Sequence, residues 1–380
     1  MAEIVPGKIG IQQRVLPRYR APFFETLALQ CPNGLEIFAG NPRAEERIVT
    51  CDDLRTATRA EARNLHMGRD GLYMCWQRGY RRWLKEFDPD TLIVAADPRI
   101  ITTYLAMRYM RARHRPVIGW GLGTLSEPGR ADRLSVVSSV RSRFYRSFDA
   151  VIAYSSKAAD DYRRAGVPEK NIFVARNAVS TAEADLARER FPPEGQEVKN
   201  WKTRNNLSKM TVIYVGRLVP GKLIPVLIQT CHDLGDDCDL VIVGDGPDRS
   251  ALERLAAERF PRTRFLGHLE GDALSIALAG SDLFVLPGRG GLAIYEAMAH
   301  GKPVVVGQGD GTEADLVKNG ENGLLVPPGD VGKLTDAIRS YIEHPERIRK
   351  EGQESRRIIK NEASIEKMTS AFVTALEFVS

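Results

Sequence analysis

The chain has 380 residues, of which 43% are hydrophobic and 27% are charged. This composition is typical of a folded globular protein and excludes a disordered or fibrous chain, and the length favours two domains of about 100–200 residues each. No apolar run approaches the roughly 20 residues of a membrane-spanning helix, and the N-terminus has no signal-peptide features, so we expect a cytoplasmic protein. The five cysteines are scattered without a C-x-x-C pair, which indicates free thiols in a reducing compartment.

Charge is divided unevenly along the chain. Residues 1–190 hold 31 Lys and Arg against 22 Asp and Glu, so 31 − 22 = +9, whereas the remainder has 23 − 27 = −4. Arginine clusters with interspersed aromatic residues supply much of the excess, at 14–20, 78–85, 108–115 and 141–146. A basic half suits an anionic partner, and nucleic acid, a phosphorylated substrate and an acidic membrane surface all remain open on charge alone.

The first half alternates short apolar runs with helical stretches. Strands are expected at residues 8–13, 35–40, 91–97, 115–121, 150–155 and 171–176. A polar stretch rich in helix-breaking residues follows at 191–209 and predicts a linker. We therefore expect an N-terminal domain over residues 1–190 and a C-terminal domain over residues 191–363.

The second half is more regular. Apolar runs at 210–216, 238–244, 281–287, 302–307 and 322–330 are each followed by a helical stretch, the last from Val331 to Glu343. Apolar strands without clear polar alternation, each followed by a helix, indicate a parallel sheet covered on both faces. Both halves are thus expected to be doubly wound, Rossmann-like α/β domains that face a central cleft, where ligands bind at the carboxyl ends of the strands.

The strand-end loops of the second half carry the candidate chemistry. They contribute Gly216, Arg217 and Lys222, then Gly244 and Gly246, then Gly290, Gly291 and Leu292. Glycine lets the backbone approach a ligand, and a helix N-terminus offers unpaired N–H groups with partial positive charge. Two cations and a set of amides predict a diphosphate site, although one glycine loop alone is more often a tight turn. Neither G-x-G-x-x-G after a strand nor a P-loop is present, which disfavours dinucleotide oxidoreductases and ATPases.

Five motifs in order carry a resemblance to a known family. They are G-R-L…K (216–222), V-G-D-G-P (243–247), F-L-G-H-L (265–269), P-G-R-G-G-L…E-A-M-A-H-G-K-P-V-V (287–305) and E…N-G-E-N-G-L-L-V-P-P-G-D (313–330). This series closely resembles the nucleotide-sugar domain of glycosyltransferase family four, whose members are retaining enzymes of the GT-B fold. More weakly, residues 12–28 resemble relatives that build bacterial surface polysaccharides. A helix at 364–380 is similar to one that returns to the first domain in this fold.

The resemblance implies roles for individual residues. Glu296 matches the second of two family glutamates eight positions apart, which contacts the donor ribose, and one carboxylate can accept hydrogen bonds from both ribose hydroxyls. The first glutamate, which contacts the donor sugar in most relatives, is replaced by Gly288. His268 and Leu269 match a loop that contacts the base.

The resemblance also implies a mechanism that needs no metal or cofactor. Arg217 and Lys222 would neutralise the phosphate that leaves a UDP- or GDP-linked sugar. Two D-x-D sequences, at 88–90 and 237–239, spell the metal–diphosphate signature of a different glycosyltransferase fold. Each precedes its predicted strand, so both are expected at the end of the sheet away from the donor.

Acceptor binding is expected on the basic first half. Arg14, Arg18 and Arg20 follow the first strand and would meet the phosphate of a lipid-diphosphate-linked acceptor. Relatives often carry a histidine within a W-G-H-G segment or at the end of the strand at 91–97, whereas this chain has W-G-L-G (120–123) and Asp97 there. Asp97, Trp120 and Gly121 complete the candidates on the acceptor or sugar side. Positive charge favours peripheral association with the inner face of the cytoplasmic membrane, and no nucleic acid is expected.

These features predict a hexosyltransferase that acts with retention on a glycan or lipid-linked glycan, in bacterial surface polysaccharide biosynthesis. Two alternatives stay open. Because Gly288 replaces a family carboxylate, the chain is alternatively a non-catalytic nucleotide-sugar-binding partner. A nucleotide-sugar epimerase of the GT-B type is less well supported, because epimerases lack the G-R-L…K and E-A-M-A-x-G-x-P-V-V series.

Overall fold

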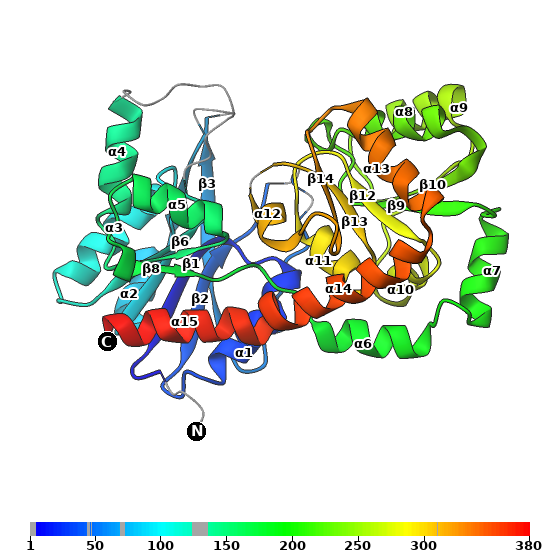
Figure 1. Cartoon of the computed structure of the whole chain (residues 1–380). Coiled ribbons are helices and arrows are strands. Elements are labelled where there is room, and N and C mark those ends of the chain that lie inside the picture. The colour runs from blue at the N-terminus through cyan, green and yellow to red at the C-terminus, as the bar shows by residue number, and fades with distance from the viewer. Residues whose placement is uncertain (1–4, 44–45, 47, 69–72, 124–135, 310) are drawn as a thin grey trace. The chain divides into compact units, whose positions relative to one another are not determined.

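The computed structural model describes residues 5–43, 46, 48–68, 73–123, 136–309 and 311–380 (Figure 1). The chain divides into two compact units, Met1–Asn177 with Ile365–Ser380, and Ala178–Ser364. Each unit contains one largely parallel sheet, the doubly wound α/β architecture that the sequence predicted. Within the described ranges, no helix is both long enough and apolar enough to cross a bilayer.

The first unit is built on a sheet of order β4-β3-β2-β1-β5-β6-β7-β8. All neighbouring strands run parallel except β3 and β4, which form an antiparallel edge. The strands are β1 (Ile9–Val15), β2 (Leu35–Gly40), β3 (Thr58–Met67), β4 (Met74–Arg78), β5 (Thr91–Ala95), β6 (Val117–Gly121), β7 (Ala150–Ala153) and β8 (Ile172–Val174). Six of them overlap predicted runs. The sequence missed β3 because most of its residues are polar, and it missed β4 because this strand is only five residues long.

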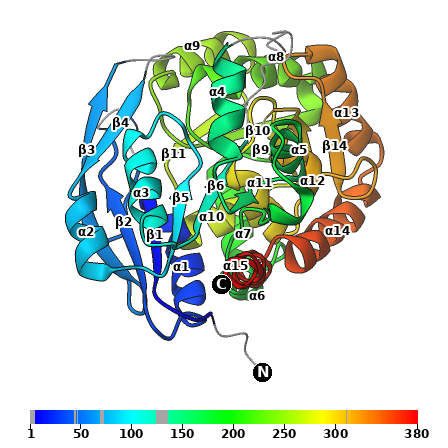
Figure 2. The ribbon, with the colours of Figure 1, turned by 90° about the vertical axis from the view of Figure 1, so that its left-hand side faces the viewer.

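Helices cover both faces of this sheet. They are α1 (Ala21–Ala28), α2 (Tyr80–Phe87), α3 (Ile101–Arg111), α4 (Val136–Tyr145), α5 (Ser156–Arg164) and α15 (Ile365–Val379). Figure 2 shows α2 and α3 in front of the strands, where Trp83 stacks on Phe38 with centroids 4.9 Å apart. On the other face α1 packs on α15, and the Phe23 and Phe372 rings meet at 4.8 Å.

The second unit is built on a fully parallel sheet of order β11-β10-β9-β12-β13-β14. Its strands are β9 (Met210–Val215), β10 (Cys238–Val243), β11 (Thr263–Gly267), β12 (Leu283–Leu286), β13 (Val304–Gly307) and β14 (Gly323–Val326). Five of these overlap predicted runs. The strand β11 was not predicted, because only part of its sequence is apolar.

Two sets of helices flank the second sheet (Figure 1). On one side α8 (Ile224–Leu234) contacts α9 (Arg249–Arg259) and α13 (Val331–Glu343). On the other side α10 (Gly271–Ala279) and α11 (Leu292–Ala299) meet α6 (Thr181–Arg190), α7 (Gln196–Arg204) and α14 (Glu346–Glu362). A short helix, α12 (Thr312–Leu316), follows β13.

The boundary between the units falls after Asn177 rather than after residue 190. The stretch 191–209 is not a simple linker, because it contains α7, whose Val198 and Trp201 side chains are buried. Only one narrow face of this helix is apolar, so its polar composition hid it. With the observed units the charge asymmetry persists: 30 Lys and Arg less 21 Asp and Glu give +9 for the first unit, and 24 − 28 gives −4 for the second.

Candidate active site

The candidate site lies where the strand order of the second unit reverses. From β9 the chain proceeds outward through β10 and β11, and then returns to place β12 on the opposite side of β9. The loops after β9 and β12 therefore lead to helices on opposite faces of the sheet. In open parallel sheets this switch point, at the carboxyl ends of the strands, is where ligands bind.

The loops after β9 and β10 are joined through their backbones. The Gly216 N–H donates to the Val243 carbonyl at 3.0 Å, and the Leu218 N–H donates to the Asp245 carbonyl at 3.0 Å. A Cβ at Gly244 would lie 1.9 Å from the Gly216 oxygen, and one at Gly246 would lie 2.2 Å from the Leu218 oxygen. Gly244 also has φ of +137°, so side chains are excluded by both space and conformation.

The loop after β12 is fixed to the loop after β9 by Lys222. Its Nζ donates to the carbonyls of Arg289 and Gly290, both at 2.7 Å, and the Arg289 N–H donates back to the Gly221 carbonyl at 3.1 Å. A Cβ at Gly288 would lie 2.4 Å from the Gly221 oxygen. The replacement of the first family glutamate by Gly288 thus has a physical reason, because the two loops pack too closely there for any side chain.

The contact of Lys222 with the carbonyls of Arg289 and Gly290 is called the Lys222 junction below. The α11 helix starts directly beside it. Gly291 is its N-cap, Leu292 is its first residue, and a Cβ at Gly291 would lie 3.6 Å from Lys222 Nζ. The N-terminal amides of α11 and the Lys222 ammonium group therefore gather positive charge at one place. Such a place favours the oxygens of a phosphate.

Glu296 lies one turn further along α11. Its side chain is 36% exposed, and burial together with the nearby Glu183 carboxylate raises its pKa to about 6. The carboxylate is therefore partly desolvated yet ionised at neutral pH, which makes it a strong acceptor for hydroxyl groups.

His300 and Lys302 have structural positions beyond the end of α11. The His300 ring is buried, with Nδ1 2.9 Å from the Glu296 carbonyl and Nε2 3.2 Å from Ser275 Oγ. Burial lowers the pKa of His300 to about 4, so the ring is neutral and does not form an ion pair with Glu296 at pH 7. Lys302 Nζ donates to the Ser281 carbonyl at 2.6 Å, and burial lowers its pKa to about 8.

Arg217, His268 and Leu269 are placed more loosely than Lys222. The Arg217 side chain is exposed, while its carbonyl accepts hydrogen bonds from the Tyr214 hydroxyl at 2.9 Å and the Val219 N–H at 3.2 Å. His268 is exposed after β11, with Nε2 2.9 Å from Glu270 Oε1, and Leu269 is half-buried against the core. These side chains occupy strand-end loops at the same edge of the sheet as the Lys222 junction.

Sequence reasoning assigned no role to Glu313, which the structure places beside Gly290. Its side chain is buried and its carboxylate accepts hydrogen bonds from the Gly309 and Gly311 N–H groups. A Cβ at Gly290 would lie 3.4 Å from Glu313 Oε2. The signal that could have revealed it is its position after β13, the strand next to β12, where the two strand-end loops must be neighbours.

The three arginines after β1 have different environments. Arg14 pairs with Glu46 at 2.8 Å, and Arg18 is exposed. Arg20 is half-buried and donates to the Tyr154 hydroxyl at 2.8 Å and to Gln13 Oε1 at 3.2 Å. The structure therefore brings Arg20, but not its two neighbours, into a network at the carboxyl edge of the sheet.

The other candidate residues of the first unit also lie in different environments. Trp120 is buried beneath Arg20, whose guanidinium carbon lies 4.5 Å from the indole centroid. Gly121 ends β6, and a Cβ there would lie 3.1 Å from the Tyr162 hydroxyl oxygen. Asp97 is paired with Arg99 at 2.8 Å, so its carboxylate is already occupied.

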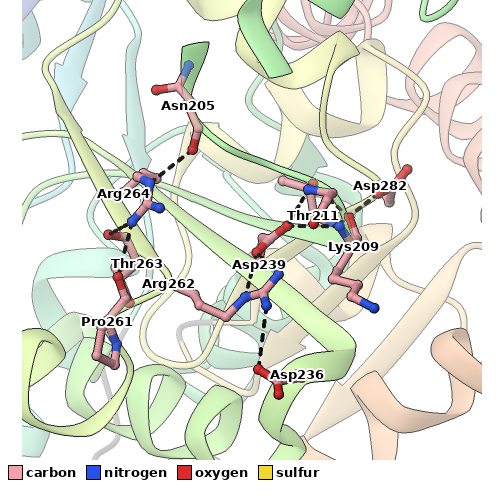
Figure 3. Close-up of polar contacts among 11 residues, drawn as sticks. Asn205, Lys209, Thr211, Asp236, Asp239, Pro261, Arg262, Thr263, Arg264 and Asp282 are labelled. Atoms are coloured by element: carbon pink, nitrogen blue, oxygen red, sulfur yellow. Dashed lines mark hydrogen bonds and ion pairs between the residues drawn. The ribbon is translucent and has the colours of Figure 1, made fainter. Parts of the chain in front are cut away.

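The two D-x-D sequences serve structural contacts. Figure 3 shows Asp239, the second residue of β10, accepting hydrogen bonds from the Arg262 Nε at 2.8 Å and the Lys209 N–H at 2.9 Å. Burial alone would raise the pKa of Asp239, but these donors lower it below its ordinary value. Asp88 pairs with Arg115 at 2.6 Å. In the described part of the chain, no three His, Cys, Asp or Glu side chains are grouped so that they could hold a metal ion.

Comparison with known proteins agrees with this arrangement. Residues 195–363 match the family described as glycosyl transferases group 1, and residues 36–183 match glycosyltransferase family 4. The chain belongs to glycosyltransferase family 4. Both sheets carry a family match, and the match over residues 195–363 contains the Lys222 junction, α11 and Glu296.

Curated relatives of the family match part of this chain. Alpha-D-kanosaminyltransferase of Streptomyces kanamyceticus is 29% identical over 213 residues, 53% of each chain. A GDP-mannose-dependent alpha-mannosyltransferase of Corynebacterium glutamicum is 34% identical over 197 residues, 50% of this chain and 43% of its own. The chain therefore spans about half the length of the curated relatives it matches.

Solved structures match the whole fold. The crystal structure of Anabaena HepE in complex with UDP has a TM-score of 0.75 and 17% identity, covering 98% of this chain and 100% of that one. Sucrose-phosphate synthase from Thermosynechococcus elongatus has a TM-score of 0.72 and 17% identity, covering 98% of both chains. The fold is GT-B.

Proposed function

We propose that this family 4 protein transfers a sugar from a nucleotide-diphosphate-sugar donor to a glycan or lipid-linked glycan, with retention of anomeric configuration, in bacterial surface polysaccharide biosynthesis. The observation that carries the proposal is the Lys222 junction, which places an ammonium group beside the N-terminus of α11 and one turn from a partly desolvated Glu296. Support also comes from the Corynebacterium relative, whose name specifies GDP-mannose, and from the UDP complex of HepE.

The donor diphosphate would rest on the N-terminal amides of α11, from Gly290 to Leu292. The phosphate gains negative charge as the bond to the sugar breaks, and Lys222 with Arg217 would stabilise that charge without a metal ion. Lys222 is already fixed by two carbonyls, so it needs little reorganisation, whereas Arg217 would have to order on binding.

The nucleoside would be held at two further points. Glu296 would accept hydrogen bonds from the two ribose hydroxyls, and the backbone around His268 and Leu269 would meet the base. Nothing at position 288 can contact the donor sugar through a side chain. Contacts to that sugar must therefore come from other groups, and Glu313 supports the loop instead, because both of its oxygens are bonded to backbone N–H groups.

Donor turnover tests this function against its alternatives. Purified protein would be incubated with UDP- and GDP-sugars, with and without a lipid-diphosphate-linked glycan, while nucleotide release and the identity of the donor sugar are followed. A transferase releases nucleotide only with acceptor, and NMR of the new anomeric proton reports retention. Conversion of the donor sugar without acceptor would indicate an epimerase, and binding without turnover would indicate a non-catalytic partner.

Membrane association is a separate part of the proposal. The first unit carries a net charge of 30 − 21 = +9, and each basic residue near an anionic surface adds attraction of about 1 kcal/mol. We expect the protein to bind peripherally to the cytoplasmic face of the membrane. It should sediment with anionic vesicles and not with neutral ones, and equal partition onto both would contradict the expectation.

A further inference from the structure

The first unit holds an arginine cluster formed by the half-buried Arg20 and the buried side chains of Gln13, Trp120 and Tyr154. Its members come from the ends of three strands, β1, β6 and β7, and from the turn Arg18–Arg20 that follows β1. Arg20 donates one hydrogen bond to Gln13 Oε1 at 3.2 Å and another to the Tyr154 hydroxyl at 2.8 Å. Its guanidinium group stacks over the Trp120 ring at 4.5 Å.

Arg20 has no acidic partner among the residues that the structure describes. Its two hydrogen bonds are made to neutral groups, whereas Arg14, six residues earlier, is neutralised by Glu46 at 2.8 Å. A desolvated cation without an anion nearby is costly, because neutral oxygens replace only part of its lost hydration. The arginine cluster is therefore short of negative charge.

The cluster is also short of hydrogen-bond acceptors. Arg20 Nε, Gln13 Nε2 and Trp120 Nε1 are buried, and none has a hydrogen-bond partner within the described part of the chain. Gln13 is only 6% exposed and Trp120 only 1%. A buried donor left unpaired costs free energy, so three of them around one uncompensated charge indicate a missing anionic ligand rather than packing alone.

Phosphate fits what the cluster lacks. Its oxygens carry negative charge and accept several hydrogen bonds at once, and the planar guanidinium group binds them in pairs. The cluster lies at the carboxyl edge of its sheet, where parallel sheets bind ligands. The donor phosphates already have a proposed place on Lys222 and α11 in the second unit, so a phosphate bound here would belong to the other substrate.

We propose that the arginine cluster binds a phosphate group of the acceptor, with Arg20 as its charged contact and Tyr154 as the residue that positions Arg20. This inference rests on the proposed function, since it names the chemical class of the acceptor. The phosphate could belong to a lipid-linked diphosphate or to a soluble phosphorylated glycan, and both present the same oxygens to the cluster.

Calorimetry tests the cluster while saturating nucleotide blocks the donor site. The probes are inorganic phosphate, inorganic pyrophosphate, and neutral vesicles that carry either a polyprenyl diphosphate or the corresponding polyprenyl alcohol. Wild type should bind the phosphate-bearing probes and not the alcohol. Preference for the vesicle-borne diphosphate over free pyrophosphate would indicate a lipid-linked acceptor, and equal affinity would indicate a soluble one.

Substitutions locate the binding. Arg20→Ala should weaken binding of the phosphate probes about tenfold or more, because a charge-assisted contact is lost, and Tyr154→Phe should weaken it less. Arg82→Ala removes the same charge from an exposed position of the first unit, where Arg82 pairs with Glu86, and it should bind like wild type. Nucleotide binding should stay unchanged in all three variants.

Several outcomes would overturn the inference. Arg20→Ala that binds the probes like wild type would contradict it, as would a loss of equal size in Arg82→Ala. If thermal melts show that Arg20→Ala is unfolded, the binding of the phosphate probes to Arg20→Lys and Tyr154→Phe decides instead, because both variants keep the core filled. A wild type that binds nucleotide but no phosphate probe refutes this inference alone, whereas one that binds phosphate through Arg20 but no nucleotide refutes the proposed function.

Discussion

The two units build the carboxyl edges of their sheets from different materials. In the second unit the edge is made of backbone: glycine loops pack against one another, and Lys222 is fixed by the carbonyls of Arg289 and Gly290. In the first unit it is made of side chains, with Arg20 held by Gln13 and Tyr154. An edge made of backbone suits a diphosphate, which many donors share. An edge made of side chains suits an acceptor, which differs between enzymes.

The largest effect is expected from a substitution that disrupts the packed glycine loops of the second unit. Gly244→Val places a side chain 1.9 Å from the Gly216 oxygen at φ of +137°, so we expect a loss of stability on the order of 3 kcal/mol and no nucleotide binding. Thermal unfolding and calorimetry measure the two effects. Gly221→Ala is the matched control, because a Cβ there meets nothing within 4 Å. Normal nucleotide binding by Gly244→Val would show that the interlocked loops are not needed.

Restoring the family glutamate tests the same packing more sharply. In Gly288→Glu the new Cβ would lie 2.4 Å from the Gly221 oxygen, which forces the loop away from Lys222. We expect nucleotide affinity to fall about tenfold or more, because the ammonium group and the start of α11 move apart. Tighter binding or faster turnover in this variant would mean that the junction accommodates a side chain, contrary to the structure.

The ribose contact should depend on pH. Since the pKa of Glu296 is raised to about 6, nucleotide affinity should weaken as pH falls through 6 and the carboxylate becomes protonated. Glu296→Gln should bind about tenfold more weakly at pH 7.5 and should lose this pH dependence. Calorimetry from pH 5 to pH 8 gives both results. An unchanged pH profile in the variant would assign the titration to another group.

Ionisation of Glu296 should have the opposite effect on the stability of the fold: it strengthens nucleotide binding but lowers the free energy of unfolding. The folded pKa of about 6 lies above the ordinary value of 4.5, so the folded state binds the proton more tightly than the unfolded state does. The ionised carboxylate therefore costs stability above pH 6, and that cost disappears below pH 4.5. Glu296→Gln should melt higher than wild type at pH 7.5 and at the same temperature at pH 4, as expected where function costs stability.

The smallest effect is expected from the removal of metal ions. Because Asp239 is bonded to Arg262 and Asp88 to Arg115, neither D-x-D sequence offers a pair of unoccupied carboxylates. EDTA should leave nucleotide binding and donor turnover unchanged. Loss of activity in EDTA that returns with Mg²⁺ or Mn²⁺ would show that Lys222 and Arg217 do not suffice for the leaving phosphate.

The same contrast explains what could be predicted from the sequence. Strands such as β9 and β10 are continuous apolar runs, and the donor loops are consecutive motifs, so both were predictable. The strand β3, between β2 and the edge strand β4, is polar along most of its length, and α7 has a single apolar face that carries Val198 and Trp201. Arg20 was a candidate from its charge and its position after the first strand, but its partners Trp120 and Tyr154 come from β6 and the end of β7, more than 90 residues away in the chain. Only the folded chain distinguishes it from Arg14 and Arg18.

Calorimetric titration with UDP, GDP and their sugar conjugates tests the donor site most directly. Wild type should bind one nucleotide at micromolar concentration, Glu296→Gln and Arg217→Ala should each weaken that binding, and Arg82→Ala should not. The nucleotide that binds would also restrict the donor sugars to those carried by that base. If no nucleotide binds to wild type, or if both donor-site variants bind as well as wild type, the donor site is not at the Lys222 junction.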